Sequence, residues 1–278
     1  MIRSVLAGAA VATVAVGAAL LPVPPAEAPA PEPRGSASAE MSAGLRGVAR
    51  AEPLAGVRIV IDPGHQLGNH NFPSRINRLV PSRPAKKACN TTGTATDAGL
   101  AEATLNFRVA RVVAARLTRR GAKVNLTRTT NREDRWGPCV DVRGRAGNGK
   151  RTRYKRADLK ISIHADGSLS GGHGFHVIAP TDTRPWTHDI HRSSRRLALS
   201  TRTALRRHGV PVADYIAGGD GLDFRGDLGT LNLSNIPTIL VELGNMRSPA
   251  DARRMTTAGG RTTYARALVA GARRFLKR

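Results

Sequence analysis

Apolar and polar residues alternate along the chain with two different spacings, and the shorter spacing predicts strands. Short runs rich in Val, Ile and Leu, bounded by turn residues such as Pro-Gly, are typical of strands buried in a sheet. Runs of this kind predict strands at residues 58–61, 122–126, 158–167, 174–180 and 238–244.

The second spacing, with apolar residues three or four positions apart, predicts helices between these strands. Residues 105–117 place leucine and valine on one helical face and arginines on the other, and Gly121 provides the stop. Helices alternating with strands indicate an α/β domain with a largely parallel sheet. Further helices are predicted at residues 187–208 and 262–278 and, with Pro249 in its first turn, after Ser248.

The N-terminal residues do not have the composition of a folded domain. An apolar stretch from Val5 to Leu21 is typical of a secretory signal. Ala-x-Ala processing sites follow at Ala26–Ala28, where Pro29 is unfavourable, and at Ala37–Ala39. The Pro-rich and then Gly/Ser/Ala-rich residues that follow predict a disordered tether. We therefore expect a signal peptide at residues 1–28, a disordered linker at 29–52 and one folded domain at 53–278. An uncleaved membrane anchor is the alternative to cleavage of the signal peptide.

Cys89 and Cys139 are the two cysteines of the chain, and both follow the predicted export signal. Two thiols in an exported chain most economically form one disulfide, with two free thiols as the alternative. Closing a loop of about fifty residues contributes roughly 4 kcal/mol in the chain-entropy model. We expect this bridge to tie down the long segment between His65 and Glu102.

The chain is strongly basic. It has 44 Lys and Arg against 20 Asp and Glu, which gives a formal net charge of +24. Such a surface favours polyanions. Because we expect export, anionic wall polymers or membrane surfaces are the candidate partners rather than nucleic acid. An arginine-rich proteome is the alternative explanation of the charge.

Three predicted strands end in polar residues that an apolar strand would not select for packing. They are His65 after IVIDPG, His164 in ISIHAD and Glu242 in ILVELG. Ligands of open α/β sheets gather at the carboxyl ends of the strands, so neighbouring strands would bring these side chains to one edge. Glu102 joins them if its helix starts above the same edge. Two histidines and one carboxylate form a catalytic zinc set, and a second carboxylate can act as general base.

Each of these residues also has a structural interpretation. A histidine at a strand end is commonly a hydrogen-bonded structural residue, and Glu102 suits a helix N-terminus through the helix dipole. Glu242 is harder to explain in this way, because a carboxylate inside an apolar strand is unfavourable unless it is paired. The structural interpretation therefore requires that all four residues coincide by accident.

The motifs DPGH (62–65), SIHAD (162–166) and VELGN (241–245), with the Glu102 helix between the first two, resemble the zinc-dependent N-acetylmuramoyl-L-alanine amidases of the family-3 type. The resemblance is especially to exported, stand-alone actinobacterial wall amidases. It implies a single α/β domain with a mixed, mostly parallel sheet of about six strands and helices on both faces. It also implies one zinc ion per chain, held by His65, Glu102 and His164, with Glu242 as the catalytic base.

The implied reaction is hydrolysis of the amide between the lactyl group of N-acetylmuramic acid and the L-Ala of the stem peptide in peptidoglycan. Asp62 is a candidate partner of a zinc ligand. Asp166 and Asn245 stand where many members carry Asn and Phe, which affects substrate contacts and leaves the four chemical residues intact. His70 and Arg75 are candidates to line a peptide groove in the long segment after His65.

Two other classes of function are compatible with these residues. A zinc peptidase or deacetylase would reuse the same ligands and would shorten stem peptides or remove N-acetyl groups. A basic wall-binding protein would carry the same site without turnover. For the amidase we expect peptidoglycan or muropeptides as the substrate, no nucleic-acid partner, a monomer, and secretion to the cell wall.

Overall fold

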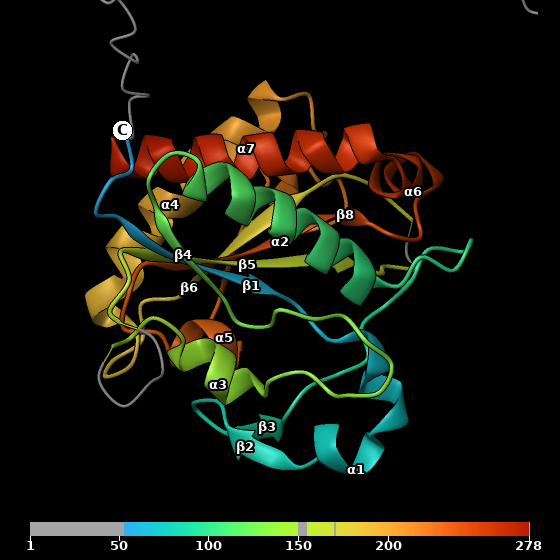
Figure 1. Ribbon diagram of the computed structural model, residues 1–278, viewed down its shortest axis with the longest axis horizontal. Helices are drawn as coiled ribbons and strands as arrows, with labels where there is room; N and C mark the ends of the chain where they lie inside the picture. Colours follow the sequence, from blue (N-terminus) through green and yellow to red (C-terminus); the bar gives the residue numbers. More distant parts are fainter. Residues whose placement is uncertain (1–52, 150–154, 170, 278) are drawn as a thin grey trace, which may run out of the picture. The chain divides into compact units, whose positions relative to one another are not determined.

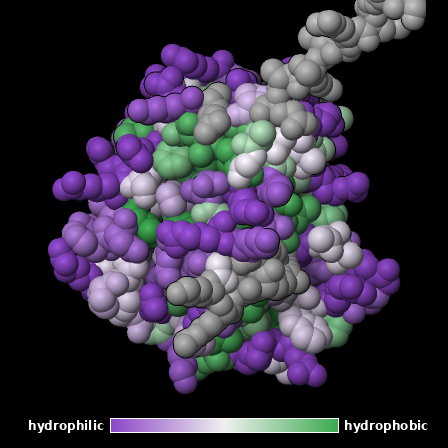
Figure 2. Space-filling view, turned by 60° about the vertical axis from the view of Figure 1, so that its left-hand side comes forward, coloured by the Kyte–Doolittle hydropathy of each residue, from purple (hydrophilic) through white to green (hydrophobic). Residues whose placement is uncertain are grey.

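The computed structural model describes residues 53–149, 155–169 and 171–277. The predicted signal peptide and linker, at residues 1–28 and 29–52, lie outside the described residues. Among the residues that are described, no helix is long and apolar enough to cross a membrane. Hydrophilic residues cover most of the face shown in Figure 2, with smaller hydrophobic patches between them.

A sheet of six strands forms the centre of the fold (Figure 1). Neighbouring strands from β4 to β8 pair in parallel, β6 pairs antiparallel with β8, and β7 pairs in parallel with β6. The predicted mixed, mostly parallel sheet is therefore confirmed. The strands follow the order β4 (Lys123–Leu126), β1 (Arg58–Pro63), β5 (Leu159–Asp166), β8 (Thr238–Asn245), β6 (His176–Pro180) and β7 (Leu222–Arg225).

Helices cover both faces of the sheet, as predicted. Figure 1 shows α2, α4 and α7 on one face and the short α3 and α5 on the other. The predicted helices are all present, although α7 begins four residues earlier than the pattern indicated. The helices are α2 (Glu102–Thr118), α3 (Val140–Arg145), α4 (His188–Arg207), α5 (Gly229–Asn232), α6 (Pro249–Thr256) and α7 (Ala258–Leu276).

The two faces of the sheet are buried in different ways. Ile61, Ile161 and Val241 belong to a large apolar cluster with residues of α2, α4 and α7. On the face of α3 and α5 the apolar clusters are small, and fully buried Asp62 and Lys160 occupy part of the interior. Successive strand residues point to opposite faces, so one strand supplies both the apolar core and this polar interior.

The long segment between β1 and α2 is structured and is held by the Cys89–Cys139 disulfide, so the predicted pairing is confirmed. Cys139 is the residue that precedes α3, and the Val140 N–H donates to the Cys89 carbonyl oxygen at 2.7 Å. The hairpin in this segment and strand β7 were not predicted, because strands of three or four residues are too short to show a periodic pattern. The segment contains η1 (Leu67–Asn71), α1 (Pro73–Ile76), β2 (Leu79–Pro81) and β3 (Lys86–Ala88), and η2 (Ala217–Gly219) precedes β7.

Candidate metal centre and active site

The carboxyl ends of β1, β5 and β8 meet at one edge of the sheet, and the predicted residues converge there. His65 lies two residues beyond the end of β1. His164 in β5 stands directly opposite Glu242 in β8. Glu102 is the first residue of α2, and its N–H donates to the Thr94 carbonyl oxygen at 2.8 Å. The parallel pairing of adjacent strands therefore brings together residues that are far apart in the sequence.

His65, Glu102 and His164 form a cluster that could hold a metal ion. The Nε2 atom of His65 lies 3.1 Å from one carboxylate oxygen of Glu102, and Nδ1 of His164 lies 3.0 Å from the other. The potential ligand atoms all lie within 4.8 Å of one another, the only such group of three found among the described residues. Ligand atoms around a tetrahedral zinc ion lie roughly 3.3 Å apart, so these distances fit one ion with small adjustments.

The carboxylate of Glu102 is held by further hydrogen bonds. It accepts from the Thr94 N–H at 3.1 Å, the Ala165 N–H at 3.2 Å and the Asn106 side-chain amide at 3.1 Å. Burial by itself would raise the pKa of Glu102, but the charge of His65 and the hydrogen bonds from both histidines hold that pKa well below its usual range. Glu102 is therefore an ionised carboxylate, the form that binds a cation.

The imidazole of His65 is oriented by a backbone carbonyl. Its Nδ1 lies 3.0 Å from the Thr91 carbonyl oxygen, so Nδ1 carries the proton that is donated and Nε2 faces Glu102. Histidines that bind metals typically donate their second ring N–H in this way. Gly64, just before His65, lies against the ring of His164, and a Cβ atom at Gly64 would come within 2.2 Å of it.

Glu242 is half-buried beside the cluster and has the properties of a proton acceptor. One of its carboxylate oxygens, Oε2, is buried without a hydrogen-bond partner in the described structure. Burial raises the pKa of Glu242 well above its usual range, and the negative charges of Glu102 and Asp166 raise it further. A carboxyl whose pKa lies closer to neutrality suits proton transfer at physiological pH.

Two residues near Glu242 were missed by the sequence analysis. His176 on β6 stands opposite Glu242 in the antiparallel pairing, and the Tyr215 ring meets the His176 ring edge-on at a centroid distance of 6.3 Å. Nδ1 of His176 and the hydroxyl of Tyr215 are both buried without a hydrogen-bond partner among the described residues. The polar residue inside the apolar run GFHVIAP was the available signal for His176.

A cavity of about 360 Å³ adjoins the cluster, on the face of the sheet covered by α3 and α5. His65 and His164 line one part of it, and Lys87 from the hairpin and Asp227 before α5 line another. Lys87 and Asp227 form an ion pair at 3.2 Å. A larger hollow of about 930 Å³ lies beside α2 and β4, but none of the four chemical residues lines it. We therefore place the candidate site at the smaller cavity.

Asp62 does not contact the cluster directly. Its carboxylate accepts from Thr127 at 2.5 Å, Ser162 at 2.6 Å and Arg143 at 2.6 Å. Burial of Asp62 would raise its pKa, but Arg143 and these hydroxyl groups hold the pKa well below its usual range. Asp62 was predicted to be a direct partner of a zinc ligand, but it does not contact His65. It binds Arg143, and the Arg143 guanidinium donates to the His65 carbonyl oxygen.

The remaining candidates lie at the margins of the site or away from it. Asp166 is a charged neighbour of Glu242, as the raised pKa of Glu242 indicates. Asn245 is fully buried, and its side-chain amide donates to three carbonyl oxygens between residues 168 and 172. His70 Nε2 lies 3.4 Å from Glu133, and the guanidinium of Arg75 stacks over a tryptophan ring at 5.2 Å. The roles of His70 and Arg75 in substrate binding stay predictions.

Known proteins are similar to this chain both in sequence and in fold. The chain is 40% identical over 225 residues to the N-acetylmuramoyl-L-alanine amidase Rv3717 of Mycobacterium tuberculosis. The aligned residues cover 80% of this chain and 88% of that relative. The apo crystal structure of the amidase Ami1 from Mycobacterium abscessus matches with a TM-score of 0.72 at 39% identity, covering 80% of this chain and 100% of Ami1. Ami1 from Mycobacterium smegmatis matches with a TM-score of 0.73 at 37% identity, covering 81% and 98%.

Residues 59–274 match the family model described as N-acetylmuramoyl-L-alanine amidase. This range contains the whole sheet except the first residue of β1, all of the helices except the end of α7, and the four chemical residues. The family resemblance read from the motifs is thereby confirmed. The chain belongs to the N-acetylmuramoyl-L-alanine amidase family.

Proposed function

We propose that this protein is a peptidoglycan hydrolase that cleaves the amide between the lactyl group of N-acetylmuramic acid and the L-Ala of the stem peptide. The observation that carries the proposal is the convergence of His65, Glu102 and His164 beside the carboxylate of Glu242, one oxygen of which is buried. Membership of the amidase family supports the choice of bond.

We propose that one zinc ion is held by His65, Glu102 and His164. The donor set of two imidazoles and a carboxylate suits zinc, and it leaves a fourth position open. The hydrogen bond from His65 Nδ1 to the Thr91 carbonyl oxygen leaves Nε2 available as a ligand. When bound, zinc supplies Lewis-acid chemistry that polarises a carbonyl and lowers the pKa of a water molecule.

Glu242 is the proposed catalytic base. Its unpaired buried oxygen can accept a proton from the attacking water, and its raised pKa allows it to hold that proton. Glu242 then gives the proton to the L-Ala nitrogen as the amide bond breaks, because an unprotonated amide nitrogen is a poor leaving group. One residue therefore serves as base in the attack and as acid in the departure.

The domain organisation predicted from the sequence is that of a protein that acts outside the cell. We propose that residues 1–28 direct export, residues 29–52 act as a linker and residues 53–278 form the catalytic domain. The net charge of +24 would favour anionic wall polymers once the protein reaches the wall.

The test combines metal analysis with product identification. Purified wild type and Glu242→Gln are each analysed for bound zinc and incubated with peptidoglycan, and the released muropeptides are identified by mass spectrometry. We expect one zinc per chain in both, intact stem peptides released from the sugar by the wild type, and turnover of Glu242→Gln lowered by about 10²–10⁴-fold. Asp189→Asn makes the same carboxylate-to-amide change at an exposed position in the first turn of α4 and should leave turnover unchanged.

Other products would contradict the amidase reaction. Shortened stem peptides would indicate a peptidase, and sugars without N-acetyl groups would indicate a deacetylase. A wild type that contains zinc and binds the wall without turnover would support a wall-binding protein.

A further inference from the structure

The turn that presents His65 follows β1 and has an unfavourable backbone conformation. His65 has a φ of +56°, in the left-handed region, where the backbone conformation of a residue with a side chain is unfavourable by about 1–2 kcal/mol of free energy. The Gly64 N–H donates to the Ile163 carbonyl oxygen at 2.9 Å, which attaches the turn to β5. Something in the surrounding structure must therefore hold His65 in this conformation.

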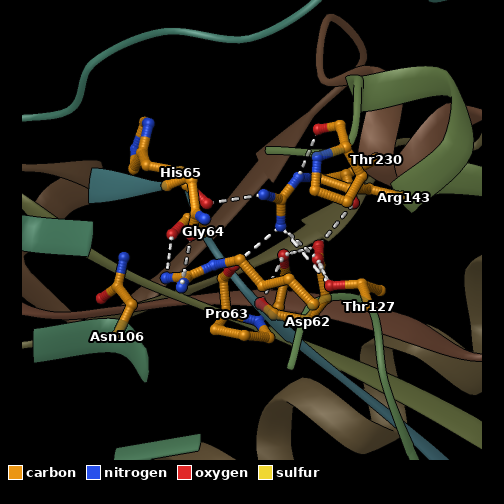
Figure 3. Close-up of polar contacts among 12 residues, drawn as sticks. Asp62, Pro63, Gly64, His65, Asn106, Thr127, Arg143 and Thr230 are labelled. Atoms are coloured by element: carbon orange, nitrogen blue, oxygen red, sulfur yellow. Dashed lines mark hydrogen bonds and ion pairs between the residues drawn. The ribbon is translucent and has the colours of Figure 1, made fainter. Parts of the chain in front are cut away.

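Arg143 of α3 holds the turn from one side (Figure 3). Its guanidinium donates to the Pro63 carbonyl oxygen and to the His65 carbonyl oxygen, each at 2.7 Å. The same group forms an ion pair with Asp62 at 2.6 Å, and both side chains are buried. Asp62 thereby fixes the guanidinium plane that binds the two ends of the turn.

Arg128, which follows β4, holds the turn from a second side. Its Nε donates to the Pro63 carbonyl oxygen at 3.0 Å, and its Nη2 donates to the Gly64 carbonyl oxygen at 3.1 Å. Nη2 also donates to the carbonyl oxygen of Ala103 at 2.7 Å. Ala103 is next to Glu102, so one guanidinium connects the His65 turn to the start of α2.

The burial of Arg128 is unfavourable by itself. Within the described part of the chain Arg128 has no ion-pair partner, and its donors bind neutral oxygens. Burial and the neighbouring charge of Arg143 lower the pKa of Arg128 to about 9, which leaves it protonated at neutral pH. The guanidinium also lies over the ring of Phe107, 5.0 Å from its centroid, so it is held by a ring and by backbone and amide oxygens. A buried cation whose hydrogen bonds go mainly to backbone carbonyl groups is consistent with a role in fixing those backbones.

We propose that Arg128 and Arg143 are positioning residues of the metal centre. They hold the backbone of residues 63–65 so that His65 points at Glu102, and Arg128 fixes the distance between the two elements that carry these ligands. This inference rests on the proposed function, because it takes His65 and Glu102 as metal ligands. Neither arginine had a signal in the sequence, where 44 Lys and Arg residues are spread along the chain.

The test measures zinc affinity in the full-length chain, by competition with a chromophoric chelator, for Arg128→Lys and Arg143→Lys. A lysine keeps the charge but cannot donate to several carbonyl groups in the fixed plane of a guanidinium. We expect zinc affinity to fall by about 10–100-fold in each variant. The absorption spectrum of the Co²⁺-loaded variants should also change, because the ligand geometry relaxes.

Arg261→Lys is the matched control. Arg261 also donates to two backbone carbonyl groups, those of Met255 and Thr256, but the hollow that it lines between α2 and α7 contains none of the proposed ligands. The zinc affinity of Arg261→Lys should equal that of the wild type.

In Arg143→Ala, millimolar guanidinium should restore part of the lost zinc affinity, because Arg143 lines the cavity and the space that its side chain leaves becomes accessible. This rescue keeps the test valid if one lysine variant does not fold.

The outcomes separate this inference from the proposed function. Zinc affinity that is unchanged in both lysine variants, while His65→Ala abolishes binding, would overturn the positioning role alone. Zinc binding that survives His65→Ala would overturn the proposed zinc centre and the positioning role together. An equal loss of affinity in Arg261→Lys would also overturn the inference, because the effect would then be general.

Discussion

Replacing Gly64 by alanine adds one methyl group at the place where the His65 turn meets His164. A Cβ atom at Gly64 would lie 2.2 Å from Cε1 of the His164 ring, 2.4 Å from Nε2 and 2.6 Å from Nδ1. Gly64 is not among the residues with positive φ, so alanine fits its backbone. The effect of the substitution therefore comes from the methyl group and not from backbone strain.

The required displacement can be worked out from these distances. Ordinary contact begins near 3.4 Å, so the ring of His164 must move by about 1.2 Å or the turn must move away from it. Metal–ligand distances tolerate deviations of about 0.2 Å, several times less than this shift. We expect Gly64→Ala to lower zinc affinity by at least about 100-fold and to destabilise the metal-free chain by about 1–3 kcal/mol.

The assay is chelator competition for zinc, combined with urea unfolding in EDTA. Gly259→Ala is the control, because no atom lies within 4 Å of the added methyl group and the position is inside helix α7. That control should keep its zinc affinity and gain a little stability, because alanine favours the helix over glycine. The reasoning is refuted if Gly64→Ala binds zinc as tightly as the wild type.

Three further predictions concern the supports of the site. Cys89→Ser combined with Cys139→Ser should lower the free energy of unfolding by roughly 4 kcal/mol, measured in urea; an unchanged midpoint would contradict the bridge as a stabilising element. The folded pKa of Asp62 is lowered, so its contribution to stability is complete above pH 3.8 and is lost as the pH falls below that value. Asp62→Asn should therefore show a flatter decline in stability below pH 3.8 than the wild type, and an equal decline would show that Asp62 is not responsible. Nδ1 of His176 has no hydrogen-bond partner among the described residues and His176 stands opposite Glu242, so we expect it to bind substrate. His176→Phe should then lower kcat/KM by about tenfold with zinc affinity unchanged, whereas unchanged kcat/KM would exclude that contact.

The sequence by itself determined the elements that depend on local pattern. The apolar runs at 58–61 and 238–244 and the helical spacing at 105–117 each specify burial on a scale of a few residues. His65, His164 and Glu242 were identifiable because polar residues stand out at the ends of apolar strands. Since the carboxyl ends of parallel strands meet at one edge, their convergence followed from the fold class.

Only the tertiary structure decided which residues support the site. Asp62 was expected to touch a zinc ligand, but it binds Arg143, eighty-one residues away, which in turn binds the His65 backbone. Arg128 and Arg143 carry no pattern that separates them from the other arginines. Hydrogen bonds to backbone carbonyl groups depend on where the chain returns in space, and the carbonyl group is the same in every residue. The spacing of residue types therefore identifies the proposed ligands, while the contacts that orient them exist only once α3, β1 and β4 are packed together.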